Sequence, residues 1–331
     1  MITEVELPGV VEPDGLRLRT REVPDLKPGQ ALVRMEATGV SFAEQQMRRG
    51  KYYDQPPFPF VPGYDFVGVI ESSGDSGLKV GQRVAALSKT GGWADRIVAE
   101  AADLVPVPDG LTAQDVEAVI VNGVTARRML DFAKVGRGDT VVVLGANGGV
   151  GSLLVRLARH LGARVVGVVS QRHMAYVRDL GAIAIDRTGD VAAEIRELAP
   201  DGVKAVFDHV GGPGIKRSWA MLGRGGALVS YGTAATRDQA GNAKLPVLAL
   251  IGRLLAWKAL PNGRTATFFN IWAGRKRNPA QLKADLEAVF NQLAAGVITA
   301  RIAQVFPLSQ ISAAMTYAES GTAAGKVVVI P

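Results

Sequence analysis

A glycine-rich turn between an apolar run and an amphipathic stretch constrains this chain more than any other feature. Residues 141–144 read Val-Val-Val-Leu, residues 146–151 read Ala-Asn-Gly-Gly-Val-Gly, and residues 152–161 have apolar side chains at helical spacing. Short apolar runs of this kind are typical of parallel strands that are covered on both faces. The order strand, glycine turn and helix predicts a dinucleotide-binding turn, in which the backbone approaches a pyrophosphate at the start of the helix.

The turn departs from the usual fingerprint at one position. Ala146 stands where the first glycine is expected, which gives the pattern A-x-G-x-x-G. Because the flanking strand and helix signals support the assignment, we still expect the turn to contact the cofactor. The candidate residues are Ala146, Asn147, Gly148, Gly149 and Val150.

The residues after the next apolar run, Arg164–Val169, indicate which dinucleotide binds. An NAD site has Asp or Glu there, whereas this chain has Ser170, Gln171, Arg172 and His173, with no acid before Asp179. An arginine fork can hold a 2′-phosphate through paired hydrogen bonds, which an acid would repel. The pattern therefore predicts NADPH, bound by Ser170, Arg172 and His173. The alternative is that Arg172 simply faces water at the start of a helix.

Chain length and the change in secondary-structure pattern along the chain predict two domains, since 331 residues are many for a single core. Strand-like runs broken by Pro and Gly predict a small β-rich domain over residues 1–115, completed by residues 271–331. Alternating strands and helices predict a doubly wound parallel sheet over residues 116–270, so the fold class is α/β. The strands expected in that second domain are residues 140–144, 164–169, 182–185, 205–208 and 227–231.

Composition narrows the partners. The chain has no cysteine, which excludes disulfides, thiolate metal sites and cysteine nucleophiles. Together with the lack of a signal-like segment in residues 1–20, this predicts a cytoplasmic protein. The net charge of +7 suits an anionic dinucleotide. Basic clusters at 48–51 and 275–277 lie in no recognisable nucleic-acid module, so no nucleic-acid partner is expected.

An unusually apolar stretch covers residues 245–260. It is too short to span a bilayer and contains Arg253 and Lys258, so no stable membrane insertion is expected. We expect a packed helix at a domain or subunit interface, because a soluble monomer rarely exposes a large apolar patch. The stretch therefore predicts a homodimer, and association with a membrane surface is the alternative.

With these residues in view, the chain resembles the medium-chain dehydrogenase/reductase superfamily, in its zinc-independent quinone oxidoreductase branch. Within that branch, residues 87–93 and 230–232 are most similar to the VAT-1 homologue subgroup. The resemblance implies a GroES-like catalytic domain and a Rossmann domain that binds NADPH. Besides the glycine turn, it is carried by residues 39–44, 49–52, 59–68, 122–126, 207–212 and 325–329.

The departures from zinc-dependent relatives define the expected chemistry. Ser41 and Tyr64 stand where those relatives have the Cys and His that bind catalytic zinc, and only Asp65 keeps a carboxylate. The three histidines show no metal-ligand spacing, so no metal is expected. Without a Lewis acid, ordinary alcohol oxidation is disfavoured. The expected reaction is hydride transfer from NADPH to a small-molecule acceptor, either a quinone or an α,β-unsaturated carbonyl.

The resemblance also implies site residues, each with an alternative. Tyr52 lies near the nicotinamide and donates to the developing oxyanion, or else only walls the pocket, with Ser41 and Tyr64 lining the same pocket. Thr125 could instead be an early helix residue that satisfies the backbone, and Asp208 could cap the next turn through Gly211 or Gly212. Arg187 could instead be a solvated surface residue, and Phe268 and Asn270 could belong to an intersubunit strand. The further cofactor contacts implied by the resemblance are Thr125, Arg187, Asp208, Gly232, Phe268 and Asn270.

Two other functions remain open at this point. One is a biosynthetic tailoring enzyme of the same fold, which reduces or reductively cyclises a polyene or enoyl natural product. The other is a non-catalytic, lipid- or membrane-interacting protein that keeps the nucleotide site for stability. We expect acceptor specificity to lie in the loops around residues 41–64 and 233–275.

Overall fold

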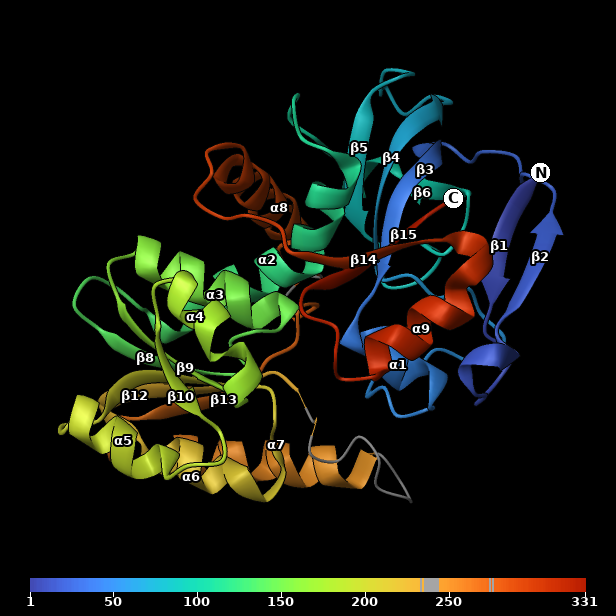
Figure 1. Ribbon diagram of the computed structural model, residues 1–331. Coiled ribbons are helices and arrows are strands. Elements are labelled where there is room, and N and C mark those ends of the chain that lie inside the picture. The colour runs from blue at the N-terminus through green and yellow to red at the C-terminus, as the bar shows by residue number, and fades with distance from the viewer. Residues whose placement is uncertain (233, 235–243, 274, 276) are drawn as a thin grey trace. The chain divides into compact units, whose positions relative to one another are not determined.

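The computed structural model describes residues 1–232, 234, 244–273, 275 and 277–331, which form two compact units (Figure 1). Unit 1 contains Met1–Val124 and Arg277–Pro331, and unit 2 contains Thr125–Lys276. The first boundary falls inside helix α2 (Ala113–Ala133) rather than in a loop. Of the predicted specificity loop, residues 233, 235–243 and 274 lie outside the described residues, as does Lys276 of the second basic cluster.

Unit 1 is built on a mostly antiparallel seven-stranded sheet, ordered β14-β15-β3-β4-β5-β7, with β6 paired to β3. The last strand of the chain pairs antiparallel with β3, where Val328 lies opposite Gly39. An inner strand of the N-terminal sheet therefore comes from the C-terminus. The strands are β3 (Gln30–Val40), β4 (Asp65–Ser72), β5 (Arg83–Leu87), β6 (Arg96–Glu100), β7 (Val105–Pro106), β14 (Ile302–Pro307) and β15 (Lys326–Ile330).

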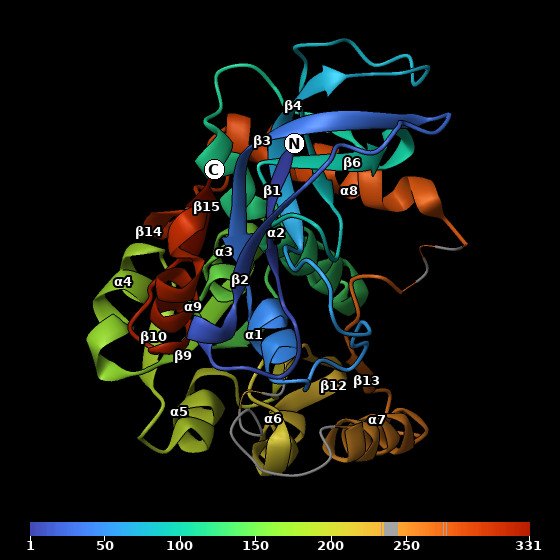
Figure 2. The same cartoon turned by 90° about the vertical axis from the view of Figure 1, so that its right-hand side faces the viewer.

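The remaining elements of unit 1 are a hairpin and three helices. Helix α9 lies beside α1 (Figures 1 and 2), and the buried guanidinium of Arg48 in α1 binds the Glu319 carboxylate at 2.8 Å. The elements are β1 (Ile2–Glu6), β2 (Arg17–Arg21), α1 (Phe42–Arg48), α8 (Pro279–Ala294) and α9 (Ile311–Glu319), with short 3-10 turns at Pro13–Gly15, Ala101–Asp103 and Leu308–Gln310.

Unit 2 is a six-stranded parallel sheet, ordered β10-β9-β8-β11-β12-β13. Helices α3 and α4 cover one face, and α5, α6 and α7 cover the other (Figure 1). This is the doubly wound arrangement expected from the sequence; β13, which the sequence did not predict as a strand, extends the sheet. The elements are β8 (Thr140–Leu144), α3 (Gly149–His160), β9 (Arg164–Val169), α4 (Met174–Asp179), β10 (Ile183–Asp186), α5 (Val191–Leu198), β11 (Val203–Asp208), α6 (Ile215–Ala220), β12 (Leu222–Ser230), α7 (Lys244–Lys258) and β13 (Thr265–Phe268), with 3-10 turns at Gln171–His173 and Gly212–Gly214.

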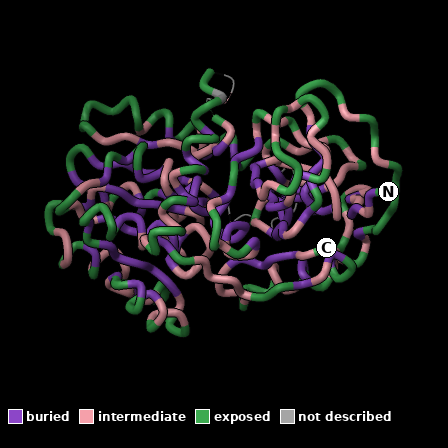
Figure 3. Tube along the Cα trace, turned by 90° about the horizontal axis from the view of Figure 1, so that it is seen from above, coloured by how far each residue is buried: buried purple, intermediate pink, exposed green. Residues whose placement is uncertain are grey.

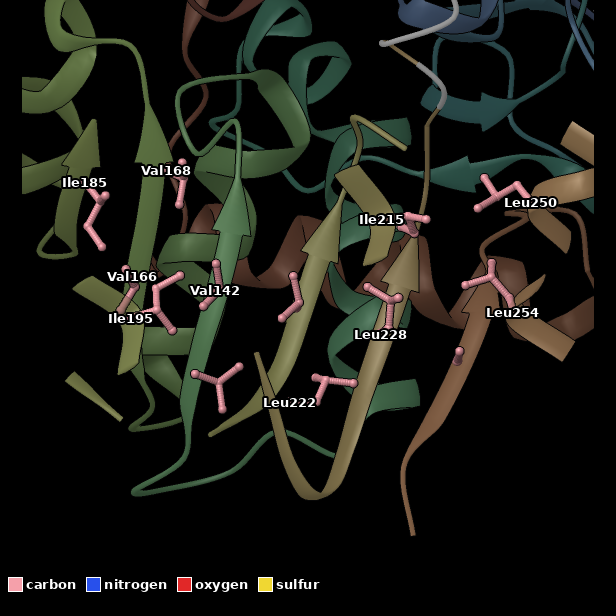
Figure 4. Packing of buried hydrophobic residues seen from close by; sticks show 13 residues of the cluster. Val142, Val166, Val168, Ile185, Ile195, Ile215, Leu222, Leu228, Leu250 and Leu254 are labelled. Carbon is pink, nitrogen blue, oxygen red and sulfur yellow. The ribbon is translucent and has the colours of Figure 1, made fainter. Parts of the chain in front are cut away.

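The core of unit 2 explains why its strands read as continuous apolar runs. Val142, Val166 and Leu228 pack against Leu254 of α7 and other helix residues in one cluster (Figure 4). The inner strands β8, β9 and β11 are buried along most of their length, whereas β10 and β13 at the two edges of the sheet are only partly buried. Buried stretches of the chain lie inside and exposed stretches at the periphery (Figure 3). Parallel strands covered on both faces have no solvent side, so neither set of alternating side chains needs to be polar.

Helix α7 accounts for the apolar stretch noted in the sequence. Leu250 and Leu254 are buried in the core of unit 2, while Leu245, Leu248 and Leu255 are each about 60% exposed on its outer face. The helix therefore has apolar residues on both faces. No helix among the described residues is both long enough and apolar enough to cross a membrane.

Candidate active site

The carboxyl edge of the unit 2 sheet gathers nearly all predicted cofactor residues, because parallel strands end on the same side. The centre of this edge lies between β8 and β11, where the strand order reverses. This is where ligands bind in open parallel sheets. The predicted residues found at this edge are Ala146–Val150 after β8, Ser170, Arg172 and His173 after β9, Arg187 after β10, Asp208 at the end of β11, Gly232 after β12, and Phe268 and Asn270 around the end of β13.

Gly145 makes the tight turn that the fingerprint lacks at Ala146. Its φ of +69° is in the left-handed region that favours glycine, and its N–H donates to the Val168 carbonyl at 2.8 Å. A Cβ on Gly145 would lie 2.4 Å from the His209 ring, and a Cβ on Gly151 would lie 2.2 Å from the Gly145 carbonyl oxygen. Gly145 is not among the predicted site residues, although it lies directly beside the predicted turn.

The start of α3 fits a pyrophosphate. The helix begins at Gly149, three residues earlier than the sequence predicts, and Gly148 at its N-cap supplies no side-chain cap. A Cβ on Gly148 would meet only the Gly145 carbonyl oxygen, at an ordinary 3.5 Å. The first backbone N–H groups of α3 are therefore uncapped by a side chain and accessible to an anionic group.

Cationic residues gather at the ends of β9 and β10. The exposed Arg172 donates through Nε to Nε2 of His173 at 3.1 Å, and the Arg187 N–H donates to the Val169 carbonyl at 2.8 Å. Arg187 is therefore held next to the 170–173 segment. An acid is also near, since Asp186 pairs in register with Val169, but its Oδ1 already accepts the Thr188 N–H.

Asp208 makes the capping contacts that its alternative interpretation predicts. Its buried carboxylate accepts the N–H groups of Val210 and Gly211 at 2.8 and 2.9 Å and the Ser218 hydroxyl at 2.6 Å. The adjacent His209, which is not among the predicted site residues, places Nδ1 2.9 Å from the Leu144 carbonyl oxygen. Because a carbonyl only accepts, Nδ1 carries the proton, and burial lowers the pKa of His209.

The other predicted contacts in unit 2 lie in different settings. Thr125 is buried in the middle of α2, so its alternative interpretation as an early helix residue is wrong. Gly232 is closely packed, since a Cβ there would lie 2.5 Å from the His209 carbonyl oxygen. Phe268 pairs in register with Ser230 on the neighbouring strand, and Asn270 accepts the Trp272 N–H through Oδ1.

Unit 1 contains the three predicted catalytic residues, of which Tyr52 and Tyr64 are buried and Ser41 is half-buried. The phenolic oxygens of Tyr52 and Tyr64 are 2.9 Å apart, and the two rings meet edge to face. Burial raises the pKa of Tyr52, and the Tyr64 hydroxyl raises it further, so Tyr52 keeps its proton. Such a phenol is a hydrogen-bond donor rather than a source of a whole proton at neutral pH.

A buried carboxylate ties Ser41 to Tyr64. Ser41 is the N-cap of α1 and forms a capping box with Glu44, as the pattern S-x-x-E predicts for a helix start. Glu44 accepts the Ser41 N–H at 2.9 Å and the Tyr64 N–H at 2.7 Å, one on each oxygen. Burial raises the pKa of Glu44 to about 7. The described residues contain no group of three or more His, Asp or Glu side chains arranged to hold a metal ion.

Two family models match the chain. The alcohol dehydrogenase GroES-like domain matches residues 27–109, and the zinc-binding dehydrogenase family matches residues 180–329. These matches confirm the predicted fold class, a GroES-like domain together with a Rossmann domain.

Curated proteins and solved structures extend the likeness over the whole chain. The human synaptic vesicle membrane protein VAT-1 homolog is 30% identical over 96% of this chain and 84% of its own length. A 2-haloacrylate reductase from Burkholderia is 29% identical over 92% and 91%. A quinone oxidoreductase structure from Pseudomonas syringae is 28% identical over the full length of both chains, with a TM-score of 0.86. A mycobacterial protein solved in complex with NADPH is also 28% identical over both full chains, with a TM-score of 0.85.

Proposed function

Because this chain belongs to the medium-chain dehydrogenase/reductase superfamily, in its zinc-independent quinone oxidoreductase branch, we propose that it is an NADPH-dependent oxidoreductase that reduces a quinone or an α,β-unsaturated carbonyl compound. The observation that carries the proposal is the glycine turn at the carboxyl edge of a doubly wound sheet, with its uncapped helix start. When bound there, NADPH supplies the hydride. The residues of the chain bind NADPH, orient the acceptor and stabilise the oxyanion that forms on it.

The preference for NADPH rests on Arg172, His173 and Arg187. All three follow the ends of β9 and β10, where the ribose of a dinucleotide lies in this fold. A 2′-phosphate there gains charge-assisted hydrogen bonds from the two guanidinium groups. The mycobacterial relative solved with NADPH supports the same choice.

An electron-poor acceptor suits the unit 1 residues. Ser41 and Tyr64 are poor zinc ligands, whereas quinones and conjugated carbonyls need no Lewis acid, because their own conjugation stabilises the anion formed by hydride addition. Tyr52 offers a phenolic hydrogen to that oxyanion. The names of two relatives, a quinone oxidoreductase and a 2-haloacrylate reductase, support acceptors of these two classes.

The test is NADPH oxidation with a panel of acceptors: 9,10-phenanthrenequinone, 2-cyclohexen-1-one, 2-chloroacrylate and a simple alcohol–ketone pair. We expect turnover with the quinone or a conjugated carbonyl, little with the isolated ketone, and unchanged rates after exhaustive chelation. Activity lost on chelation and restored by zinc would contradict the metal-free assignment. Binding of NADPH without oxidation by any conjugated acceptor would favour the non-catalytic alternative.

We also infer that the protein is a homodimer through unit 2. Leu245, Leu248 and Leu255 expose an apolar stripe on α7, and β13 is the edge strand that packs against this helix. A patch of this kind is uncommon on a soluble monomer. Light scattering is expected to give twice the chain mass. The paired variant Leu248→Glu/Leu255→Glu is expected to give the monomer mass, while the exposed Leu18→Glu in unit 1 serves as the matched control.

A cytoplasmic location remains a proposal that rests on the cysteine-free composition.

A further inference from the structure

Unit 1 contains a buried ion cluster whose members come from different parts of the chain. The Lys326 ammonium at the start of β15 lies 3.3 Å from both carboxylate oxygens of Asp65 and 2.9 Å from Oε1 of Glu117 in α2. All three side chains are at most 4% exposed. Gly39 leaves the space for them, since a Cβ there would lie 2.2 Å from Glu117 Oε1 and 2.3 Å from Lys326 Cε.

The contacts distinguish the two carboxyl groups of this cluster. Asp65 accepts a further hydrogen bond from the Val121 N–H at 3.1 Å. Among the described residues, neither carboxyl oxygen of Glu117 has a hydrogen-bond partner, and Oε1 has only the ion-pair contact with Lys326. A buried, unpartnered carboxylate oxygen is costly, so Glu117 is expected to be neutral. Burial raises the pKa of Glu117 well above its usual range, although Lys326 opposes this. The cluster is therefore a Lys326–Asp65 ion pair beside a neutral acid.

Lys326 remains charged in this setting. Burial by itself lowers the pKa of an ammonium. The ionised Asp65 carboxylate, together with the contact to Glu117 and the nearby Glu44, more than offsets this and raises the pKa of Lys326 above its ordinary value. A fixed positive charge therefore lies in the interior of unit 1, held from two sides by side chains of β4 and α2.

The ammonium also reaches a predicted catalytic residue. Lys326 Nζ donates to the Ser41 hydroxyl oxygen at 3.0 Å. A hydroxyl that accepts from a cation becomes a stronger donor through its own hydrogen. Within the part of the chain that the structure describes, no group accepts the Ser41 hydroxyl hydrogen. Ser41 is half-buried, and its backbone N–H shares the Glu44 carboxylate with the Tyr64 N–H, so Glu44 links the Ser41 backbone to that of one of the paired tyrosines.

We propose that Lys326 is a positioning residue that polarises Ser41, so that the Ser41 hydroxyl donates a hydrogen bond to the carbonyl oxygen of the acceptor while that oxygen gains negative charge. The proposal rests on the proposed function. As a hydride adds to the acceptor carbon, the conjugated π electrons move to the carbonyl oxygen, and the resulting oxyanion takes its proton from water afterwards. Ser41 thus supplies a second donor beside Tyr52, and Lys326 sets its strength without touching the substrate.

The test is a mutant cycle built to keep the fold intact. Lys326→Met alone leaves the Asp65 carboxylate buried and unpaired, so the informative variant is Lys326→Met/Asp65→Asn, which removes both charges together. Ser41→Ala removes the hydroxyl, the triple variant combines all three changes, and Lys283→Met on the exposed face of α8 is the control for losing a lysine. The measurements are melting temperature, NADPH binding by nucleotide fluorescence, and turnover of 9,10-phenanthrenequinone and 2-cyclohexen-1-one.

Ser41→Ala and the Lys326/Asp65 variant are each expected to lose about 10²-fold in kcat, as for removal of one oxyanion donor, with NADPH binding unchanged. The triple variant is expected to lose little more than either, because both changes act on one hydrogen bond. Losses that multiply, or full turnover in the folded Lys326/Asp65 variant, would overturn the role of Lys326. A parent protein that oxidises no NADPH with any conjugated acceptor would instead overturn the proposed function, and this inference with it.

Discussion

The hydroxyl oxygens of Tyr52 and Tyr64 lie 2.9 Å apart in the interior of unit 1. Each hydroxyl has one hydrogen, so only one of the two can donate in this contact. When Tyr64 donates, the Tyr52 hydroxyl donates to the Tyr53 hydroxyl at 3.4 Å, a long contact that a substrate oxygen can replace. The bond accepted from Tyr64 strengthens Tyr52 as a donor. In the proposed mechanism Tyr52 contacts the acceptor, and Tyr64 orients the Tyr52 hydroxyl.

Replacing Tyr52 by Phe keeps the ring and removes only the hydroxyl. Turnover of a quinone or enone is expected to fall about 10²-fold, the scale of losing one oxyanion donor, while KM changes less because the contact strengthens as charge develops. Tyr64→Phe leaves the Tyr52 hydroxyl in place and is expected to cost less. Steady-state kinetics of both variants check this. Unaltered turnover in Tyr52→Phe would show that Tyr52 only lines the pocket and donates no hydrogen bond to the oxyanion.

Arg172→Ala is expected to weaken NADPH binding about 10- to 100-fold, the value of one charge-assisted hydrogen bond. NADH affinity should stay the same, because NADH lacks the 2′-phosphate. Fluorescence titration with both nucleotides gives the ratio, and Arg178→Ala, also an exposed arginine of this region, is a suitable control. Equal affinity of the parent protein for NADH and NADPH would contradict the assignment of the 170–173 segment.

Two glycines of the nucleotide turn are expected to fail in different ways. Gly151→Ala forces a Cβ to within 2.2 Å of the Gly145 carbonyl oxygen, so it should lower the melting temperature and abolish NADPH binding together. Gly148→Ala adds only an ordinary contact at 3.5 Å, so the fold should survive while the methyl group obstructs the pyrophosphate. Thermal melting and NADPH titration on both variants separate the two effects. If the Gly148→Ala protein binds NADPH with parental affinity, the pyrophosphate does not bind at this turn.

The fold of unit 2 could largely be predicted because local sequence patterns mark its strands and turns. Continuous apolar runs mark β8 and β9, and the turn between β8 and α3 carries its glycines in sequence. β13 escaped prediction because Thr265–Phe268 is short and becomes a strand only by pairing with β12. The first unit boundary lies after Val124, whereas the sequence places it after residue 115. Helix α2 contains both positions, and no local pattern marks a boundary inside a helix.

Residues of the candidate site could be predicted from the sequence only where they lie together in one continuous segment. The glycine turn and the 170–173 segment could be located from sequence, whereas Lys326 meets Asp65 across 261 residues of chain. His209 contacts the Leu144 carbonyl across 65 residues, so its role depends on the sheet order. Glu44 was visible as part of a capping box, but its second contact, to Tyr64, needs the folded loop before β4.

The raised pKa of Glu44 predicts a stability that depends on pH. The pKa rises from an ordinary value of 4.5 to about 7 in the folded chain, mainly through burial. Between these two values the folded state holds a proton that the unfolded state has lost, so the free energy of unfolding falls as pH rises through this window. The contribution from Glu44 amounts to at most about 3 kcal/mol across the window.

Glu44→Gln removes this titration and should flatten the slope between pH 4.5 and 7, measured as the difference in unfolding free energy between variant and parent. The amide oxygen can still accept one of the two backbone N–H groups, so the variant is expected to fold. Glu287→Gln, on the exposed face of α8, is the matched control and should leave the slope unchanged. A parental slope in Glu44→Gln would assign the buried proton to Glu117, whose pKa burial also raises. In that case Glu44, which links the backbones of Ser41 and Tyr64, would remain an ionised carboxylate between pH 4.5 and 7.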